Sequence, residues 1–314
     1  MQDSDISKLI STLESNISKV VYGKSQVVRQ CLVALFAGEH VLLEDVPGVG
    51  KTLIGRAIAK SVSGDFKRLQ FTPDLLPADI TGSNYYDSKT QEFHFSQGPI
   101  FANILLADEI NRTTPRTQSA MLEAMNEQQV SVDGKSYPLP KPFMVIATEN
   151  PMEYEGTYLL PESQLDRFLV RISVGYPDRE SEMEVLRSHQ QGKPIDSLQP
   201  VLSCDQILEI QQAAANVKID DSIYRYILDL VDATRQNDSL LVGTSTRGAI
   251  AFSKAAQAYA LLEGRRFVVP DDIKILAVPI LAHRVMTKSF SHGNHRATVE
   301  SLIEHIIETI PVPV

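Results

Sequence analysis

The stretch EDVPGVGKTL, residues 44–53, decides the fold, because it comes within one residue of a phosphate-binding loop. Such loops follow the pattern G-x-x-x-x-G-K-[ST]. The eight positions that end at Thr52 carry Asp45 where the pattern has its first glycine, while Gly50 and Lys51 are intact. We expect the Asp45 carboxylate to point away from bound phosphates, because it would otherwise repel them.

The flanking sequence predicts the strand and the helix that a phosphate loop needs. Residues 40–44 form an apolar run typical of a buried strand, and residues 51–62 have helical periodicity. Glycines between them let backbone N–H groups face phosphates, and a helix N-terminus adds positive charge. Lys51 is expected to reach the β- and γ-phosphates, and the Thr52 hydroxyl to bind Mg²⁺. The predicted nucleotide contacts are Pro47, Gly48, Val49, Gly50, Lys51, Thr52 and Leu53.

Acidic and amide side chains follow two later strands. Residues 103–110 run into Asp108 and Glu109, and residues 143–150 end at Asn150. Because parallel strands gather their ligand contacts at their carboxyl ends, we expect these groups to meet there. Asp108 would hold Mg²⁺ directly or through water, Glu109 would orient or deprotonate the attacking water, and Asn150 would hold that water or the γ-phosphate. Taken alone, a solvated acidic pair and a turn-forming amide are the simpler interpretations.

Strand and helix signals alternate up to residue 177. Further strands are expected at 66–72 and within 167–176, a helix at 114–128, and a hairpin around an Asp-Gly turn at 129–140. This alternation predicts an α/β fold whose parallel sheet has helices on both faces. Beyond it, helical periods dominate. The predicted organisation is an α/β nucleotide-binding core over residues 1–177 and an all-α lid over residues 178–314.

Composition sets broad limits on function. The 314 residues are 43% hydrophobic and 22% charged, enough for a packed core. A net charge of -9 disfavours a protein that coats nucleic acid, so no nucleic-acid partner is expected. Cys31 and Cys204 form no metal or disulfide framework. Since there is no signal peptide and no uncharged apolar run of 18 residues, we expect a cytoplasmic protein without stable membrane insertion.

Long stretches of the chain resemble the MoxR-type AAA+ ATPases. The resemblance runs from about residue 22 to 177, and continues more loosely into the C-terminal third through GTSTRGAIAF. MoxR-like sequences often lack the first glycine of the loop, so Asp45 fits the family. The matching stretches are LLEDVPGVGKT, LQFTPDLLPADITG, GPIFANILLADEINR, TQSAMLEAMNEQQVSVDG, FMVIATENP and LLPESQLDRFLVRISVGYP.

The resemblance implies roles for residues outside the phosphate loop. Tyr22 and Gly23 match the segment that runs beside the adenine, and Asn150 matches sensor 1. Arg247 matches the sensor 2 arginine of the lid, although Thr246 stands where the family more often has proline. The implied ligands are ATP or ADP with Mg²⁺.

The resemblance also implies an arginine that acts between subunits. Arg167, in QLDRF, matches the arginine finger that contacts the γ-phosphate held by a neighbouring subunit, and Arg171 is a second candidate. A salt bridge is the simpler interpretation of Arg167, as it is of Arg247. A finger supplied in trans implies a homo-oligomeric ring, with a hexamer as the expected size.

Two stretches resemble insertions that mark this AAA+ clade. Residues 82–100 resemble the insert in helix 2, and residues 129–142 the hairpin before sensor 1. Both would face the pore or one rim of the ring. The insert carries four aromatic residues that either contact clients or pack the hairpins, and packing is the favoured interpretation. These residues are Tyr85, Tyr86, Phe93 and Phe95.

The expected function is that of an ATP-driven, chaperone-like remodeller or maturation factor for protein clients. In the family, partners commonly carry a von Willebrand factor A domain, so such a partner and a client protein are expected. A nucleic-acid-dependent AAA+ motor, a metal-chelatase-type motor subunit and a nucleotide-gated scaffold are the alternatives. Net charge disfavours the first of these, and the intact Glu109 and Arg167 disfavour the scaffold.

Overall fold

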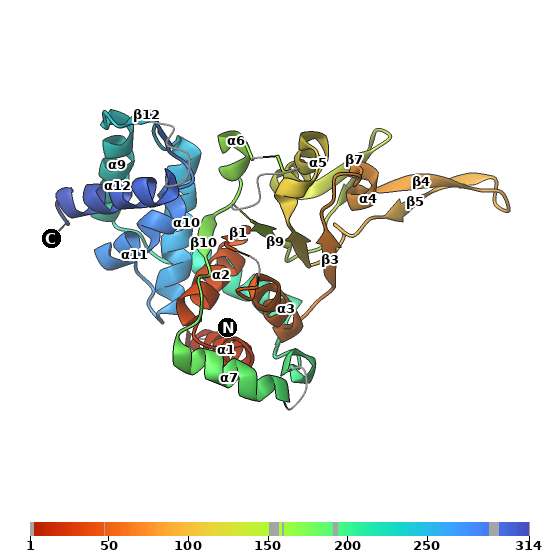
Figure 1. The fold of residues 1–314 in the computed structure, drawn as a ribbon, viewed down its shortest axis with the longest axis horizontal. Coiled ribbons are helices and arrows are strands. Elements are labelled where there is room, and N and C mark those ends of the chain that lie inside the picture. The colour runs from red at the N-terminus through yellow and green to blue at the C-terminus, as the bar shows by residue number, and fades with distance from the viewer. Residues whose placement is uncertain are drawn as a thin grey trace.

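The computed structural model of the chain describes residues 3–46, 48–150, 157–158, 160–190, 194–288 and 295–313. A central sheet lies between a helical C-terminal part and a long hairpin that reaches away from the body (Figure 1). Pro47, one of the predicted nucleotide contacts, lies outside the described residues.

The sheet has five strands, and all of its neighbouring strands are parallel. Their order is β10 (Val170–Ser173), β1 (Val41–Glu44), β9 (Met144–Glu149), β6 (Ile104–Asp108) and β3 (Phe66–Gln70). The three inner strands are buried along their whole length, as their apolar runs predict. The predicted α/β architecture with a parallel sheet is confirmed.

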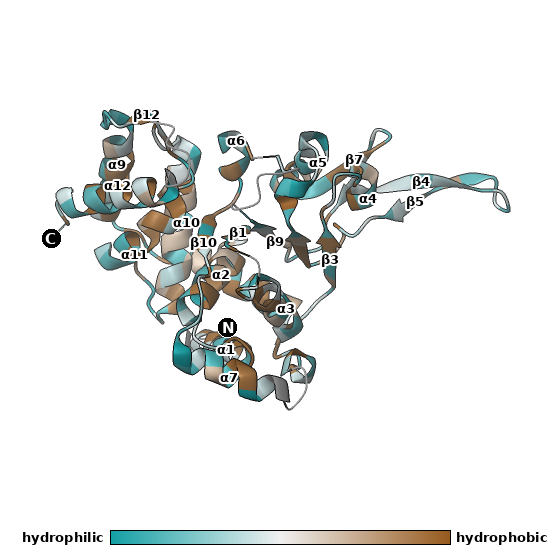
Figure 2. Cartoon of the chain, viewed as in Figure 1, coloured by the Kyte–Doolittle hydropathy of each residue, from teal (hydrophilic) through white to brown (hydrophobic). Residues whose placement is uncertain are grey.

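Helices cover both faces of this sheet because neighbouring strand residues point to opposite sides. Leu43, Leu106 and Ile146 belong to the core shared with α1 (Asp3–Ser18), α2 (Ser25–Ala37) and α3 (Lys51–Ser61). Leu42 and Leu105 belong to a second core with α5 (Pro115–Glu127). Brown, apolar segments accordingly gather at the sheet and its inner helices (Figure 2).

Two hairpins interrupt the core at the positions expected for insertions. The first consists of β4 (Gly82–Asp87) and β5 (Glu92–Gln97), preceded by the short helix α4 (Pro77–Thr81). The second consists of β7 (Gln129–Val132) and β8 (Lys135–Pro138), joined at the predicted Asp-Gly turn with positive φ at both residues.

The aromatic residues of the first hairpin divide between packing and exposure. The Phe95 ring stacks on Tyr137 of the second hairpin at 4.1 Å, so it packs the hairpins together. Tyr85, Tyr86 and Phe93 are 53%, 54% and 73% exposed. Phe95 therefore packs the hairpins together, as the favoured interpretation has it. The other three remain exposed to solvent, although each contacts a ring on the opposite strand, Tyr86 with Phe93 and Tyr85 with His94.

The part after residue 178 is mainly helical, as predicted. Its helices are α7 (Arg179–Gln190), α8 (Cys204–Ala215), α9 (Asp221–Gln236), α10 (Thr246–Leu262), α11 (Pro270–Leu281) and α12 (His295–Thr309). The sequence missed three short strands, β11 (Leu202–Ser203), β12 (Leu240–Val242) and β13 (Met286–Thr287). These have only two or three residues, too few for a period-2 pattern. Within the described ranges, no helix is long and apolar enough to cross a membrane.

The helical part is joined to the core at several points. β11 pairs with β2 (Val62–Ser63), which directly follows α3. α8 packs against α2 and α10, while α11 contacts the edge strand β10. These contacts attach the helical part to α2, to the residues that follow α3 and to the edge of the sheet.

Candidate active site

A cavity of about 530 Å³ lies at the carboxyl end of the sheet, beside the phosphate loop. Val20, Val185 and Ile195 give its lining apolar side chains suited to a base, and the lining also includes charged groups. Sequence reasoning missed these apolar residues, because nothing local in α7 marks Val185 as lining a site. The predicted residues that line the cavity are Tyr22, Gly48, Gly50, Lys51, Thr52, Leu53, Asp108, Glu109 and Asn150.

Two predicted nucleotide contacts do not line the cavity. Val49 is 8% exposed and belongs to the main core. Gly23 has a φ of 67°, and a Cβ there would lie 2.3 Å from the Ser181 hydroxyl. Gly23 thus allows the turn after α1 to approach the start of α7, and its neighbour Tyr22 is the one that reaches the cavity.

The phosphate loop has the backbone that anion binding requires. Gly48 and Gly50 have φ values of 88° and 96°, in the region that favours glycine. Gly50 also caps α3 without a side-chain hydrogen bond, so the first N–H groups of the helix are available to an anion. The loop is therefore shaped for phosphate even without the first glycine of the pattern.

Lys51 is held beneath this loop by backbone carbonyls. Its ammonium donates to the carbonyl of Asp45, to that of Glu149 at 3.1 Å and to that of Val46 at 3.4 Å. Burial lowers the pKa of Lys51, and the nearby carboxylates, including Glu109, oppose this only in part. A polyanionic phosphate chain would supply the counter-charge that these carbonyls only partly provide.

Asp45 ties the loop to the edge of the sheet. Its carboxylate accepts from the Ser173 hydroxyl at 2.8 Å, the Gly175 N–H at 2.6 Å and the Val46 N–H at 2.7 Å. Partial burial raises the pKa of Asp45, but these hydrogen bonds and the charge of Lys51 outweigh it, so the pKa lies below its usual value. The carboxylate points to the end of β10 and away from the cavity lining, as expected from the sequence.

We predict that Asp45→Ala lowers the free energy of unfolding at pH 7 by about 1–3 kcal/mol, because it leaves the part-buried N–H donors of Val46 and Gly175 without their charged acceptor. The depressed pKa stabilises the folded state above about pH 4, and this contribution is lost as the pH falls through the folded-state pKa. Urea unfolding from pH 7 to 3 should therefore show the free energies of unfolding of the two proteins converging.

Asp45→Gly should leave the affinity for ATP within a few-fold of that of the unaltered protein. A large gain in affinity would show that the carboxylate repels phosphate.

The acids that follow β6 lie opposite the start of α3. Asp108 Oδ1 lies 3.4 Å from the Thr52 hydroxyl and 3.3 Å from the Thr148 hydroxyl. A threonine hydroxyl beside a carboxylate is the hard-oxygen pair that Mg²⁺ prefers, so the donors fit this ion. The other oxygen, Oδ2, accepts from Arg68 Nε at 2.6 Å.

Glu109 is held in an uncommon backbone conformation. Its φ is 58°, the left-handed region that few non-glycine residues occupy. Its N–H donates to the Thr148 hydroxyl at 2.9 Å, and its carboxylate accepts from Gln70 Nε2 at 2.7 Å and Arg112 Nε at 3.1 Å. Glu109 follows the last residue of β6, and it lines the cavity.

Sequence reasoning missed the residues that hold these two acids. Arg68 and Gln70 lie on β3, the strand paired with β6, and Gln70 is directly opposite Asp108 in the register. Two polar residues at alternate positions of a predicted strand were a usable signal. The order of strands in the sheet, which the sequence did not give, was needed to interpret it.

A buried ionic cluster lies beside the loop, at the ends of β1 and β9. Glu44 is opposite Glu149 in the register. The Glu44 carboxylate pairs with Arg171 and, at 2.9 Å, with Arg296 of α12. Asn150, which follows Glu149, is buried and lines the cavity. Arg171, the second finger candidate, is thus committed to Glu44 inside the chain.

Glu149 should make stability depend on pH. Burial raises its pKa to about 7, and the Glu44 carboxylate adds to this. An unfolded glutamate ionises near pH 4.3, so the folded state loses stability as the pH rises from there to about 7. We predict that Glu149→Gln stabilises the protein by on the order of 3 kcal/mol above pH 7, and hardly at all near pH 4.5. Thermal unfolding across this range, with the exposed Glu304→Gln as control, checks it; a pH-independent gain would contradict it.

The two remaining predicted arginines lie away from the phosphate loop. Arg167 and Arg247 both line a second cleft, of about 660 Å³, between the core and the helical part. Arg167 Nη1 donates to the Leu122 carbonyl at 3.1 Å, and its buried Nε has no partner within the described residues. Arg247 is exposed in the first turn of α10. One chain alone therefore does not bring either guanidinium to the cavity beside Lys51.

Comparison with protein families agrees with this geometry. Residues 40–170 match the model of the ATPase family associated with various cellular activities (AAA), and residues 232–306 match the AAA lid domain. The first match runs from β1 to the first residue of β10 and includes the phosphate loop and Asp108. The second spans most of the helical part, including Arg247.

Known proteins match nearly the whole chain. An uncharacterized protein, YeaC, of Bacillus subtilis is 50% identical over 99% of this chain and 97% of its own length. Chaperone MoxR1 of Mycobacterium tuberculosis is 39% identical, with 97% and 83% covered, and Protein MoxR of Methylorubrum extorquens is 30% identical, with 96% and 94% covered. A solved structure of a candidate ATPase from Cytophaga hutchinsonii superposes with a TM-score of 0.90 at 38% identity, covering 99% of this chain and 97% of its own.

Proposed function

The chain belongs to the MoxR family of AAA+ ATPases, and we propose that it binds Mg-ATP in the cavity beside the phosphate loop and hydrolyses it to ADP and phosphate. One observation supports this best: Lys51, Thr52, Asp108 and Glu109 line one cavity. Lys51 and the loop N–H groups bind the β- and γ-phosphates. Thr52 and Asp108 would hold Mg²⁺, which would supply positive charge beside the phosphates, while Glu109 and Asn150 orient the attacking water.

We propose further that the active site is completed by a second copy of the chain in a ring, for which a hexamer is the expected size. The support is that, within one chain, Arg167 and Arg247 line the second cleft and not the cavity beside the phosphate loop. In a ring, the second cleft of one subunit faces the nucleotide of its neighbour. Arg167 then supplies the finger, since Arg171 is paired with Glu44.

The work done by hydrolysis is chaperone-like remodelling or maturation of a protein client, with a partner that carries a von Willebrand factor A domain. This proposal rests on the family resemblance and on the relative named Chaperone MoxR1. We place the protein in the cytoplasm, and we assign nucleotide binding to residues 1–177 and the lid to residues 178–314. Rotation of the lid against the core would transmit the nucleotide state to the client.

Capture of partners from the native lysate tests this function. Tagged Glu109→Gln protein with Mg-ATP should retain a protein client or a von Willebrand factor A domain protein that Lys51→Ala protein does not retain. Glu109→Gln keeps the nucleotide and stalls hydrolysis, whereas Lys51→Ala removes the phosphate contact. If nucleic acid is the main nucleotide-dependent partner, and DNA stimulates turnover, the proposal is wrong and the chain is a nucleic-acid motor.

A further inference from the structure

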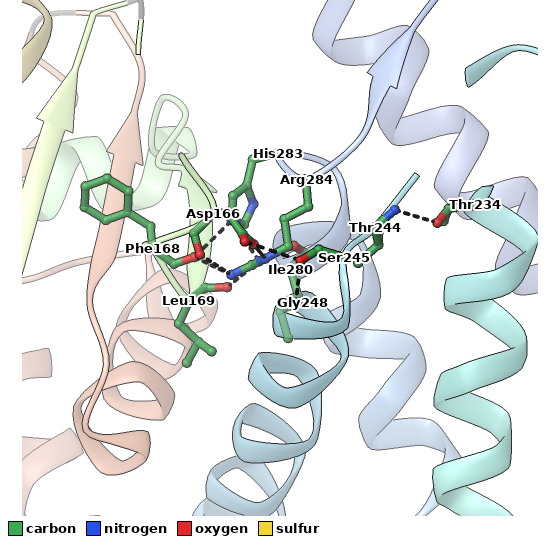
Figure 3. A network of polar contacts seen from close by, with 10 residues as sticks. All are labelled: Asp166, Phe168, Leu169, Thr234, Thr244, Ser245, Gly248, Ile280, His283 and Arg284. Atoms are coloured by element: carbon green, nitrogen blue, oxygen red, sulfur yellow. Dashed lines mark hydrogen bonds and ion pairs between the residues drawn. The ribbon is translucent and has the colours of Figure 1, made fainter. Parts of the chain in front are cut away.

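Asp166 directly precedes Arg167 and contacts residues at the start of α10 and just after α11. It ends the short helix α6 (Glu162–Leu165), and its side chain is 19% exposed. One carboxylate oxygen, Oδ1, accepts from Arg284 Nε at 2.8 Å, and the other, Oδ2, accepts from the Ser245 hydroxyl at 3.4 Å. Figure 3 shows these side chains converging from the core and the helical part.

Arg284 holds the backbone around Arg167. It lies just beyond α11, and its side chain is only 2% exposed. Besides the Asp166 pair, it donates to the Phe168 carbonyl at 2.6 Å and the Leu169 carbonyl at 3.1 Å, and the neighbouring His283 ring nitrogen lies 3.0 Å from the same Phe168 carbonyl. One buried guanidinium thus binds the chain on both sides of Arg167, through side chain and backbone.

The same carboxylate reaches the start of the helix that carries Arg247. Ser245 is the N-cap of α10, and its hydroxyl also accepts from the Gly248 N–H at 3.2 Å. A Cβ at Gly248 would lie 3.0 Å from Arg284 Cδ, so the glycine lets this first turn pack against Arg284. Arg247 lies in that turn, one residue before the glycine.

We propose that Asp166 and Arg284 are positioning residues that fix Arg167 and Arg247 as one unit, so that both are presented together to the nucleotide of a neighbouring subunit. This inference rests on the proposed role of the two arginines in trans. Both positioning residues line the second cleft beside the two arginines, with the side chains of Arg284 and Asp166 only 2% and 19% exposed. We assign them no contact with the nucleotide, because their polar atoms are used in holding Arg167 and α10. The cluster is also one of the contacts that join the lid to the core, and it lies beside both arginines, so a movement of the lid would move both arginines together.

A double-mutant cycle between Asp166→Asn and Arg167→Ala tests this proposal. Asp166→Asn alone should lower the ATP turnover of the assembled protein by about 10- to 100-fold, because small displacements of a positioned group are costly. In the Arg167→Ala background it should lower turnover by less than about 2-fold, because the group that it positions is already absent. The affinity of the protein for a fluorescent ATP analogue should stay the same in both.

Asp272→Asn is the matched control. It breaks another aspartate–arginine pair of the helical part, in which Asp272 accepts from Arg265 at 2.8 Å, and neither residue lines the second cleft. It should lower the melting temperature as much as Asp166→Asn does, with less than about a 2-fold effect on turnover. An equal loss of turnover in both variants, or an unchanged Asp166→Asn effect in the Arg167→Ala background, would make Asp166 merely structural and overturn the inference.

Two further results keep the test decisive. If Asp166→Asn does not fold, Ser245→Ala in a cycle with Arg247→Ala replaces it, with the N-cap variant Ser203→Ala of α8 as control. The same pattern of non-additivity is then expected, and additive losses would overturn the proposal. If Arg167→Ala by itself leaves turnover unchanged, the proposed role in trans fails, which distinguishes that failure from a failure of positioning alone.

Discussion

Replacement of Glu109 by glutamine is expected to lower ATP turnover by about 10²- to 10⁴-fold while leaving Mg-ATP bound, because it removes a general base without touching the phosphate or metal contacts. The structure supports this separation. Asp108 and Thr52, the proposed Mg²⁺ ligands, lie next to each other, and Glu109 is turned out of the strand by its left-handed backbone. Glutamine keeps the size of the side chain. Its single amide oxygen keeps only part of the hydrogen bonding to the neighbouring donors.

Steady-state turnover and equilibrium binding of a fluorescent ATP analogue check this prediction. Glu304→Gln, an exposed change on α12, is the matched control and should behave as the unaltered protein. Turnover within about 10-fold of normal would remove Glu109 from the role of base. Loss of nucleotide binding would show that the residue acts in the ground state.

Replacement of Arg167 by alanine is expected to lower turnover by about 10³-fold or more in the assembled protein. Nucleotide affinity of the dilute, unassembled chain should not change, because Arg167 lines the second cleft and not the cavity. Turnover measured against protein concentration separates the two states. Arg116→Ala, at an exposed arginine of α5, is the control.

The second finger candidate gives a contrasting result. Arg171→Ala leaves the buried Glu44 with one partner fewer, so it should lower the free energy of unfolding by about 3–5 kcal/mol. Arg167 has no carboxylate partner among the residues that the structure describes, so Arg167→Ala should unfold nearly as the unaltered protein does. If instead Arg171→Ala folds normally and abolishes turnover, the two arginines have been assigned in the wrong order.

The sequence predicted the parts of the site that depend on neighbours along the chain. Loop glycines, the helix that begins at Lys51 and the acids at the end of β6 are local patterns, and buried parallel strands require long apolar runs. The prediction that the Asp45 carboxylate points away from the cavity also agrees with the structure. What it binds was not predictable, because Gly175 is 130 residues away and an N–H donor leaves no mark in the sequence.

Contacts between distant elements could not be predicted in the same way. The salt bridge between Arg68 and Asp108 depends on the order of strands in the sheet. The position of Arg247 depends on how the lid packs against the core. Residue type does not distinguish an arginine that pairs inside the chain, such as Arg171, from one that we propose to act on a neighbour, such as Arg167. Only the buried partner Glu44 makes that distinction.

The central claim is that one active site is built from two copies of the chain, and mixing two inactive variants tests it most directly. Glu109→Gln protein lacks the base but keeps Arg167, and Arg167→Ala protein lacks the finger but keeps Glu109. When the two are mixed and allowed to assemble, some interfaces contain one intact cavity and one intact finger. Turnover should then rise well above that of either variant alone, in proportion to the mixed interfaces. If the mixture stays as inactive as its components while co-assembly is confirmed, the arginine acts within its own chain and the account is wrong.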